Sequence, residues 1–190
     1  MASSVQKLLR RNAYSHVKNL LAKLRAADIS SIMLEMNDRE QRSVFSILME
    51  RDRQLAAETL KVLGLEWGLD LLLQRPSEEI GEVIQEMESD VAAAFISALP
   101  EEVAQEVLER MDNQESSEVQ ELLGYQEETA GRIMTPNVFS LHEELTVGEA
   151  IQTIQTAKEL EMVFYLYVVD ERNHLVGVVS LRQLLMVAPT

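Results

Sequence analysis

The sequence predicts a mainly α-helical protein with a small α/β part: a right-handed α-solenoid of short, armadillo- or HEAT-like helices, followed by a β-α-β-β-α module. Three observations lead to this fold class. Apolar residues recur at helical spacing over roughly the first 124 residues. Amphipathic segments begin about every twelve residues late in that stretch. After Pro136, strand-like apolar runs and turn residues replace the helical pattern.

The first predicted helical segment covers residues 5–25, where seven apolar residues follow helical spacing. They are Val5, Leu8, Leu9, Val17, Leu20, Leu21 and Leu24. From Asp28 to about Leu123, short amphipathic segments follow one another with little between them. Trp67, the single tryptophan, is expected to anchor the core of this region.

The clearest helix starts lie near residues 77, 89, 100 and 115. Each opens with Ser, Pro or Asp together with an acidic residue, which suits a helix N-terminus by side-chain capping and by the helix dipole. Two helices at this spacing make a unit of about 24 residues. Stacked units of that kind form an α-solenoid.

The chain after Pro136 predicts a strand, a helix, two strands joined by a hairpin turn, and a final helix. Thr146 and Glu149 form a T-x-x-E capping box, and the unbroken apolar run in residues 162–169 is typical of a strand covered on both faces. The five elements are expected in residues 137–141, 146–157, 162–170, 174–180 and 180–187.

The formal charge of −15 is unevenly distributed. Up to Arg25 the chain has six Lys or Arg and no acidic residue, whereas the remaining 165 residues carry 11 basic and 32 acidic side chains, a net charge of −21. Such a surface repels nucleic acid and favours divalent cations. Acidic helices also keep proteins soluble, so composition alone leaves both interpretations open.

Several kinds of chemistry are excluded or unsupported by the sequence. The absence of cysteine excludes disulfides, thiolate zinc sites and cysteine nucleophiles. His16, His142 and His174 lack a metal-ligand spacing, and neither a nucleophile elbow nor a P-loop is present. The longest apolar run has eight residues, against ~20 for a membrane span, and the N-terminus lacks a secretory signal pattern. We therefore expect a soluble, cytoplasmic, non-enzymatic chain.

Residues 125–136, "YQEETAGRIMTP", carry a family resemblance. "GRIMTP" followed by the β-α-β-β-α pattern, "YLYVVD" and "LVGVVSLRQLL" resembles the first half of a CBS-domain pair. Joined to an acidic helical region, it resembles the cytoplasmic part of the MgtE family of magnesium channels. The resemblance implies a helical N domain in residues 1–124, a hinge in 125–136 and the first CBS motif in 137–190, with Pro136 suited to strand entry because it lacks an N–H.

The resemblance also implies a mechanism. In this family a homodimer carries a helical N domain, two CBS motifs and a transmembrane pore, and Mg²⁺ held between acidic faces of the N and CBS domains stabilises the closed pore. It implies a homodimer through the CBS motifs, a second CBS motif and a pore domain beyond this chain, and a place at the cytoplasmic face of the inner membrane.

The implied metal ligands are Glu58, Asp90 and the main-chain carbonyl of Arg132. Val91 and Ala94 stand where the family commonly has aspartate, so we expect magnesium sensitivity that is retained but shifted, or that depends on acidic residues beyond residue 190. On the residues alone, Glu58 would be an exposed charge and Asp90 a residue explained by helix capping.

For nucleotides, Tyr165 and Arg182 match positions that line the adenine-nucleotide pocket of the family. Gln183 replaces the aspartate that usually holds the ribose hydroxyls, and with Ser180 it forms an S-x-x-Q capping box. ATP or AMP binding is therefore left open. Two alternative functions also stay open: a soluble CBS-domain regulator that senses adenine nucleotides, and a helical-repeat scaffold that binds a protein partner.

Overall fold

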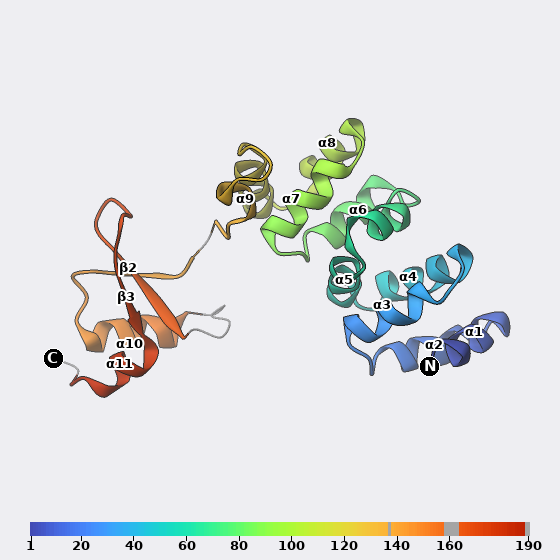
Figure 1. Cartoon of the computed structure of the whole chain (residues 1–190), viewed down its shortest axis with the longest axis horizontal. Coiled ribbons are helices and arrows are strands. Elements are labelled where there is room, and N and C mark those ends of the chain that lie inside the picture. Colours follow the sequence, from blue (N-terminus) through green and yellow to red (C-terminus); the bar gives the residue numbers. More distant parts are fainter. Residues whose placement is uncertain (137, 158–163, 189–190) are drawn as a thin grey trace. The chain divides into compact units, whose positions relative to one another are not determined.

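The computed structural model describes residues 1–136, 138–157 and 164–188, and its contacts divide the chain into two compact units, Met1–Pro136 and Asn137–Thr190 (Figure 1). The first unit is helical; the second holds a three-stranded sheet with two helices. The prediction of a mainly helical chain with a small α/β part is therefore confirmed. No helix in the described part of the chain is both long enough and apolar enough to span a bilayer.

Helices in the first unit pack mainly on their near neighbours in sequence. α3 contacts α5, α5 contacts α7, α6 contacts α8 and α7 contacts α9, as expected for stacked helix pairs. The helices are α1 (Ala2–Arg10), α2 (Tyr14–Leu21), α3 (Ala26–Leu34), α4 (Asp38–Arg51), α5 (Arg53–Leu72), α6 (Ser77–Ile84), α7 (Ser89–Ala98), α8 (Glu101–Arg110) and α9 (Asn113–Leu123), followed by the 3-10 helix η1 (Ala130–Ile133).

Residues 5–25 are two helices rather than one segment. α1 ends at Arg10, and Asn12 adopts a left-handed conformation with φ of 53°, which reverses the chain before α2. Asn tolerates this conformation better than most residues. The apolar spacing continued across the turn because Val5 and Leu9 of α1 and Val17 of α2 all enter one core. Periodicity alone therefore could not reveal the break.

The late helix starts are confirmed to within two residues, and α6, α7, α8 and α9 begin twelve residues apart. The predicted side-chain capping is wrong, because none of these four helices has a side-chain hydrogen bond at its N-cap. The stabilisation of these helix starts is electrostatic instead, because acidic residues occupy the first turn of each helix, where the helix dipole favours them.

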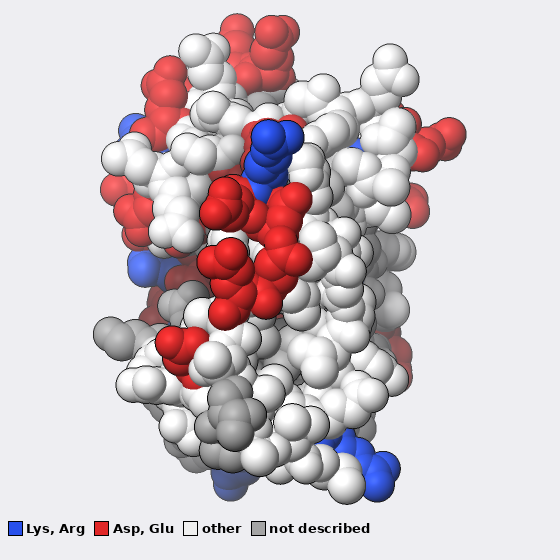
Figure 2. All heavy atoms as spheres, turned by 90° about the vertical axis from the view of Figure 1, so that its left-hand side faces the viewer, with Lys and Arg blue, Asp and Glu red and all other residues white. Residues whose placement is uncertain are grey.

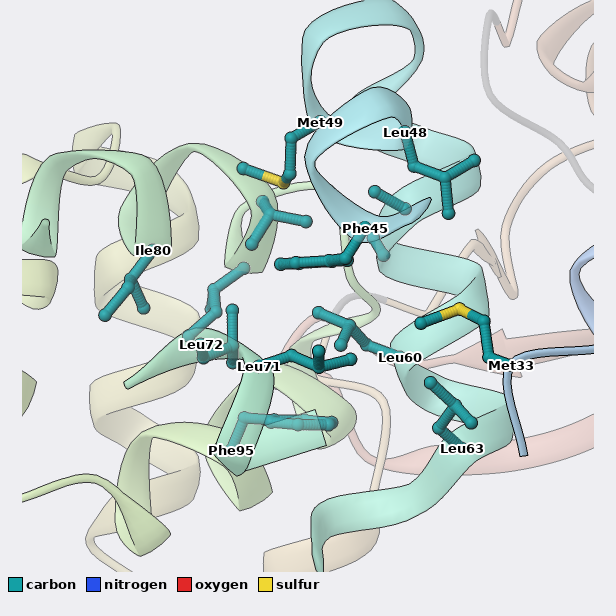
Figure 3. Packing of buried hydrophobic residues seen from close by; sticks show 14 of the residues in the cluster. Met33, Phe45, Leu48, Met49, Leu60, Leu63, Leu71, Leu72, Ile80 and Phe95 are labelled. Carbon is teal, nitrogen blue, oxygen red and sulfur yellow. The ribbon is translucent and has the colours of Figure 1, made fainter. Parts of the chain in front are cut away.

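The core of the first unit centres on large side chains from α4, α5 and α7, including Phe45, Leu60 and Phe95 (Figure 3). α5 is interrupted at Gly64, whose φ of 81° and ψ of 171° are not helical. Trp67 follows this kink and is 43% exposed, so the prediction that it anchors the core is wrong. The kink turns the segment that follows, and Gly68 rather than Trp67 meets the Phe95 ring.

The second unit confirms the β-α-β-β-α order. Its sheet has the order β1-β2-β3, with β1 parallel to β2 and β2 antiparallel to β3. The elements are β1 (Ser140–His142), α10 (Val147–Thr156), β2 (Tyr165–Val169), β3 (Leu175–Ser180) and α11 (Leu181–Met186). A small core joins Leu141 and Leu166 of the sheet to Ala150 and Leu184 of the two helices.

Two details of the second unit differ from expectation. β1 begins at Ser140, four residues after Pro136, so Pro136 does not enter the strand directly. β2 is not covered on both faces: Tyr167 is 43% exposed, and so is its cross-strand partner Val178, at 53%. Both predicted helix starts, with capping boxes at Thr146 and Ser180, are confirmed. Asn137, Met162 and Val163, included in predicted strands, lie outside the described residues.

Candidate functional site

Glu58 and Asp90, the two predicted metal-binding carboxylates, lie on helices that pack together. Glu58 is exposed on α5, and Asp90 is half-buried in the first turn of α7. Asp90 makes no side-chain capping hydrogen bond at the start of α7, so capping does not account for it. Both carboxylates therefore stand on neighbouring elements of the first unit.

Two basic side chains lie among the acids of this region. Lys61, one turn after Glu58, contacts Glu88 with 2.5 Å between Nζ and Oε2, and this ion pair links α5 to the residue that precedes α7. Arg53 contacts Glu82 of α6, with 2.7 Å between Nη2 and Oε2. The ion pairs lower the local negative charge, and Lys61 is the cation nearest in sequence to Glu58. The sequence interpretation had not singled it out.

Within the described residues, no group of three or more acidic or histidine side chains is gathered in a way that would hold a metal. Asp and Glu side chains nevertheless collect on the molecular surface, as Figure 2 shows for one face. Val91 packs against the core, so a carboxylate at that position would point toward apolar side chains. Because so few protein oxygens are gathered here, an ion bound at Glu58 or Asp90 would retain much of its water shell, as Mg²⁺ commonly does in proteins.

Arg132 directs its guanidinium into the first unit. It donates to the carbonyl oxygen of Leu122, at 2.9 Å, and to the hydroxyl of Ser97. Its side chain thus ties η1 to the end of α9 and to α7; both acceptors are neutral, so these hydrogen bonds do not balance its positive charge. The role of the Arg132 main-chain carbonyl as a metal ligand stays a prediction.

Gly131, beside Arg132, has a packing reason for being glycine. A Cβ placed there would lie 2.5 Å from Cδ1 of Tyr125, which is far inside van der Waals contact. The Tyr125 ring therefore lies directly against the backbone of η1. This explains why an aromatic residue and a glycine stand at the two ends of "YQEETAG".

Tyr165 and Arg182, the predicted nucleotide-pocket residues, line the same surface groove in the second unit. The groove has a volume of about 720 Å³ and is also lined by Phe164, Leu185 and Met186. Tyr165 is 67% exposed. An aromatic ring and a guanidinium at one groove suit stacking on a base and pairing with a phosphate. The apolar residues at the end of α11 were not predicted to take part.

Gln183 acts as a capping residue. Its Oε1 accepts from the backbone N–H of Ser180 at 3.2 Å and from the Ser180 hydroxyl at 2.9 Å, while its own N–H donates to the hydroxyl oxygen of Ser180 at 3.2 Å. The side-chain oxygen is thus occupied by the start of α11. No carboxylate stands at this position to accept hydrogen bonds from ribose hydroxyls.

The turn between β2 and β3 depends on the Asp170 side chain. Its Oδ1 accepts from the backbone N–H groups of Arg172 and His174, both at 2.8 Å, and Oδ2 lies 3.1 Å from Nδ1 of His174. Hydrogen bonding from the backbone of His174 is the main reason that the pKa of Asp170 is lowered. The pKa of Glu149 is lowered in the same way, chiefly by the backbone N–H of Thr146 in its capping box.

Comparison with known families gives two matches along the chain. The MgtE intracellular N domain model matches residues 24–128, and the CBS domain model matches residues 130–189. Neither model describes a catalytic domain. The expected resemblance is therefore confirmed on both parts of the sequence.

Curated relatives named magnesium transporter MgtE share 28% identity with this chain over 193 residues in Thermus thermophilus and 28% over 183 residues in Bacillus subtilis. A relative in Enterococcus faecalis is 44% identical over 75 residues. The Thermus and Bacillus matches cover 100% and 96% of this chain, which spans only 42% and 40% of those proteins.

Two solved structures have the same fold. One is the cytosolic domain of the Mg²⁺ channel MgtE in complex with ATP, with a TM-score of 0.86 and 28% identity over 100% of this chain and 77% of the other. The second is the soluble part of a magnesium transporter, with a TM-score of 0.77 and 25% identity over 99% of this chain and 73% of the other.

Proposed function

Because the chain belongs to the family of MgtE intracellular N domains, we propose that it is the magnesium-sensing regulatory region of a magnesium transporter or channel. The observation that carries the proposal is the sign of the charge on both units. Residues 1–136 contain 25 acidic and 14 basic side chains, and residues 137–190 contain 7 and 3. Two bodies of like charge approach closely only when cations lie between them.

In this proposal Mg²⁺ controls the approach of the acidic N domain to the CBS part. Glu58, Asp90 and the main-chain carbonyl of Arg132 supply oxygen ligands, and water fills the remaining positions around the ion. Loss of Mg²⁺ leaves the carboxylates unscreened, the units separate, and the pore of the complete protein is released from its closed state. We propose residues 125–136 as the hinge, with its movement confined to the end near Pro136, because Tyr125, Gly131 and Arg132 pack within the first unit.

The proposed partners are a second copy of the chain and the rest of the transporter. Tyr167 and Val178 leave an apolar face of the sheet open, and that face supports pairing with another CBS motif, either further along the chain or in a second copy. The complete protein would hold this region at the cytoplasmic face of the inner membrane.

Small-angle X-ray scattering tests the proposal directly. The chain should become more compact when Mg²⁺ replaces a chelator, and Glu58→Gln should require more Mg²⁺ for the same change. Glu66→Gln is a matched control, because it removes one exposed carboxylate from the same helix. An unchanged scattering curve in Mg²⁺ and chelator, or an equal effect of both variants, would falsify the proposal.

A specific observation also favours a second candidate function, adenine-nucleotide sensing. Tyr165 and Arg182 share one groove, and ATP is bound in the similar cytosolic domain of the Mg²⁺ channel MgtE. Calorimetric titration with ATP tests this function. Saturable binding that is weakened by Arg182→Gln, together with an absence of any response to Mg²⁺, would favour this function over magnesium sensing.

A further inference from the structure

The N-terminal helices carry charge opposite to that of the chain. All six charged residues up to Arg25 are basic, in a chain with a net charge of −15. Arg10, Arg11 and Lys7 are exposed in α1 and in the turn that follows. Residues 1–23 also precede the part matched by the MgtE intracellular N domain model, which begins at residue 24.

A cavity of about 520 Å³ lies between this basic segment and the start of α4. Its polar lining includes Arg10, Asn12 and Tyr14 from the first two helices and their turn, and Arg39 and Ser43 from α4. The Tyr14 hydroxyl donates to Oδ1 of Asn12 at 3.2 Å, which leaves the Asn12 side-chain NH₂ group as a donor. The cavity thus combines two guanidinium groups with a neutral donor.

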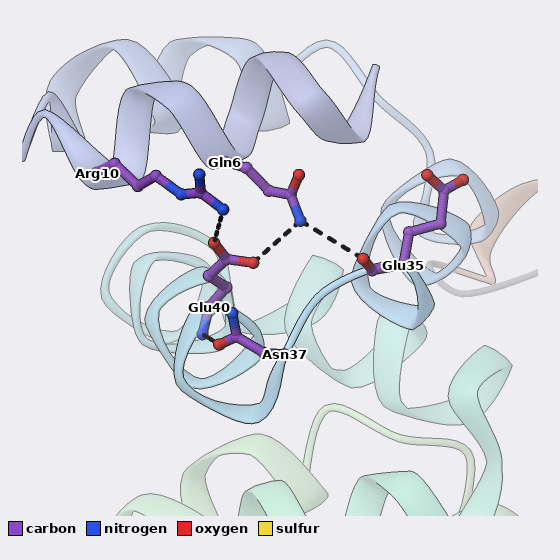
Figure 4. A network of polar contacts seen from close by, with 5 residues as sticks. All are labelled: Gln6, Arg10, Glu35, Asn37 and Glu40. Carbon is purple, nitrogen blue, oxygen red and sulfur yellow. Dashed lines mark hydrogen bonds and ion pairs between the residues drawn. The ribbon is translucent and has the colours of Figure 1, made fainter.

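Glu40, the one acidic residue in the lining, is already paired (Figure 4). Its side chain is 11% exposed; Oε2 accepts from Gln6 at 3.0 Å, and Oε1 lies 3.5 Å from Nη2 of Arg10. Asn37 caps the backbone N–H of Glu40 at 3.0 Å. Glu40 therefore pairs with Arg10, whose side chain is still 72% exposed and has further N–H groups to donate.

Arg39 is placed where a cation is disfavoured. It lies in the first turn of α4, next to the positive end of the helix dipole, and shares the cavity with Arg10. Within the described residues its guanidinium has no hydrogen bond or ion pair. The neighbouring acid, Asp38, lines a different pocket beside Trp67. An anion in this cavity would balance the charge of Arg39 and could also accept from the N–H groups of Arg10 that Glu40 leaves free.

We propose that this cavity binds a phosphoryl group. A phosphoryl group offers several oxygens that can accept from both arginines and from Asn12 together, and Arg matches phosphate with paired N–H donors. Because Glu40 already pairs with Arg10, the lining keeps one positive charge in excess, which an anionic phosphoryl group would balance. The group comes either from free phosphate compounds or from lipid headgroups at a bilayer surface.

The test uses the whole chain and two variants that each remove one positive charge. Inorganic phosphate is titrated at constant ionic strength and followed by calorimetry and by backbone amide shifts of Asn12 and Ser43. Arg39→Gln should weaken binding about tenfold or more, because hydrogen bonds to charged groups are lost. Arg42→Gln should not, because Arg42 lies outside this cavity and is bonded to Gln74 at 2.6 Å.

A second arm separates the two sources of the phosphoryl group. Sedimentation with phosphatidylcholine vesicles, with and without phosphatidylglycerol, measures headgroup binding. Phosphate binding that depends on Arg39, or vesicle binding that depends on Arg39 but not on Arg42, supports the proposal and identifies the source. The absence of both kinds of binding, or an equal loss in both variants, overturns it. Asn12→Gly, which keeps the left-handed turn, should weaken binding by a smaller factor and provides a second check if Arg39→Gln is poorly folded.

Discussion

Gly64 allows a test of backbone strain, and Gly81 provides a control in which the same substitution should change stability in the opposite direction. It interrupts α5 with φ of 81° and ψ of 171°, a region of backbone conformation that is accessible almost only to glycine. A Cβ added at this position would meet nothing within 4 Å, so crowding plays no part. Gly64→Ala should therefore lower the free energy of unfolding by about 1–3 kcal/mol through backbone strain alone.

The matched control is Gly81→Ala in α6. Gly81 is not among the glycines with positive φ, and its added Cβ would lie 3.8 Å from the Val107 carbonyl oxygen, an ordinary contact. Alanine is favoured over glycine inside a helix by about 0.5–1 kcal/mol, so this variant should be stabilised. The two Gly→Ala substitutions should move stability in opposite directions.

Urea unfolding followed by circular dichroism and by Trp67 fluorescence measures both effects. Trp67 lies three residues after the kink and is the single tryptophan of the chain, so its emission reports on the first unit. If Gly64→Ala is as stable as the unmodified chain or more so, residue 64 does not have a positive φ in solution and the argument from backbone strain is refuted. If Gly81→Ala is the less stable of the two, the reasoning from backbone conformation fails as a whole.

Three further predictions concern other parts of the chain. Gly131→Ala should destabilise the first unit by about 1–3 kcal/mol in urea, because its Cβ would overlap the Tyr125 ring; Tyr125→Ala in the same background should recover part of that loss. Asp170 and Glu149 have lowered pKa values, so the stability that they contribute is present above their ordinary values of 3.8 and 4.5 and is lost as pH falls through the lower folded values. Thermal unfolding of the second unit should show this acid loss, and Asp170→Asn should reduce it; an unchanged pH profile in that variant contradicts the assignment. Lys61→Met should raise the affinity for Mg²⁺ in calorimetry by removing a cation close in sequence to Glu58, whereas lower affinity would mean that the ion pair with Glu88 organises the site.

The sequence was most informative where local chemistry determines local structure. Capping boxes at Thr146 and Ser180 marked two helix starts correctly, because each needs only four consecutive residues. It was least informative where backbone conformation changes without a change in the apolar pattern. The break at Asn12 and the kink at Gly64 both fall inside apparently continuous helical spacing.

The exposure of individual residues also depended on tertiary structure. Trp67 was expected in the core because tryptophan is large and apolar, but the kink at Gly64 left it on the surface. The apolar run of β2 indicated a strand correctly but not which face would be covered. For the candidate site, the shape of the groove that Tyr165 and Arg182 share could not be predicted from the sequence. It depends on the pairing of β2 with β3, which places α11 beside Tyr165.

The near-neighbour packing of helices in the first unit has a consequence for biosynthesis. Because these helices mostly contact partners one or two positions away in the chain, few contacts need residues that are synthesised much later. Each newly synthesised pair of helices can pack against the previous pair while the polypeptide is still leaving the ribosome. The parallel pairing of β1 with β2 is different, since Ser140 must wait for Tyr167 to emerge. The nascent chain can therefore complete its helical half before its sheet has begun to form.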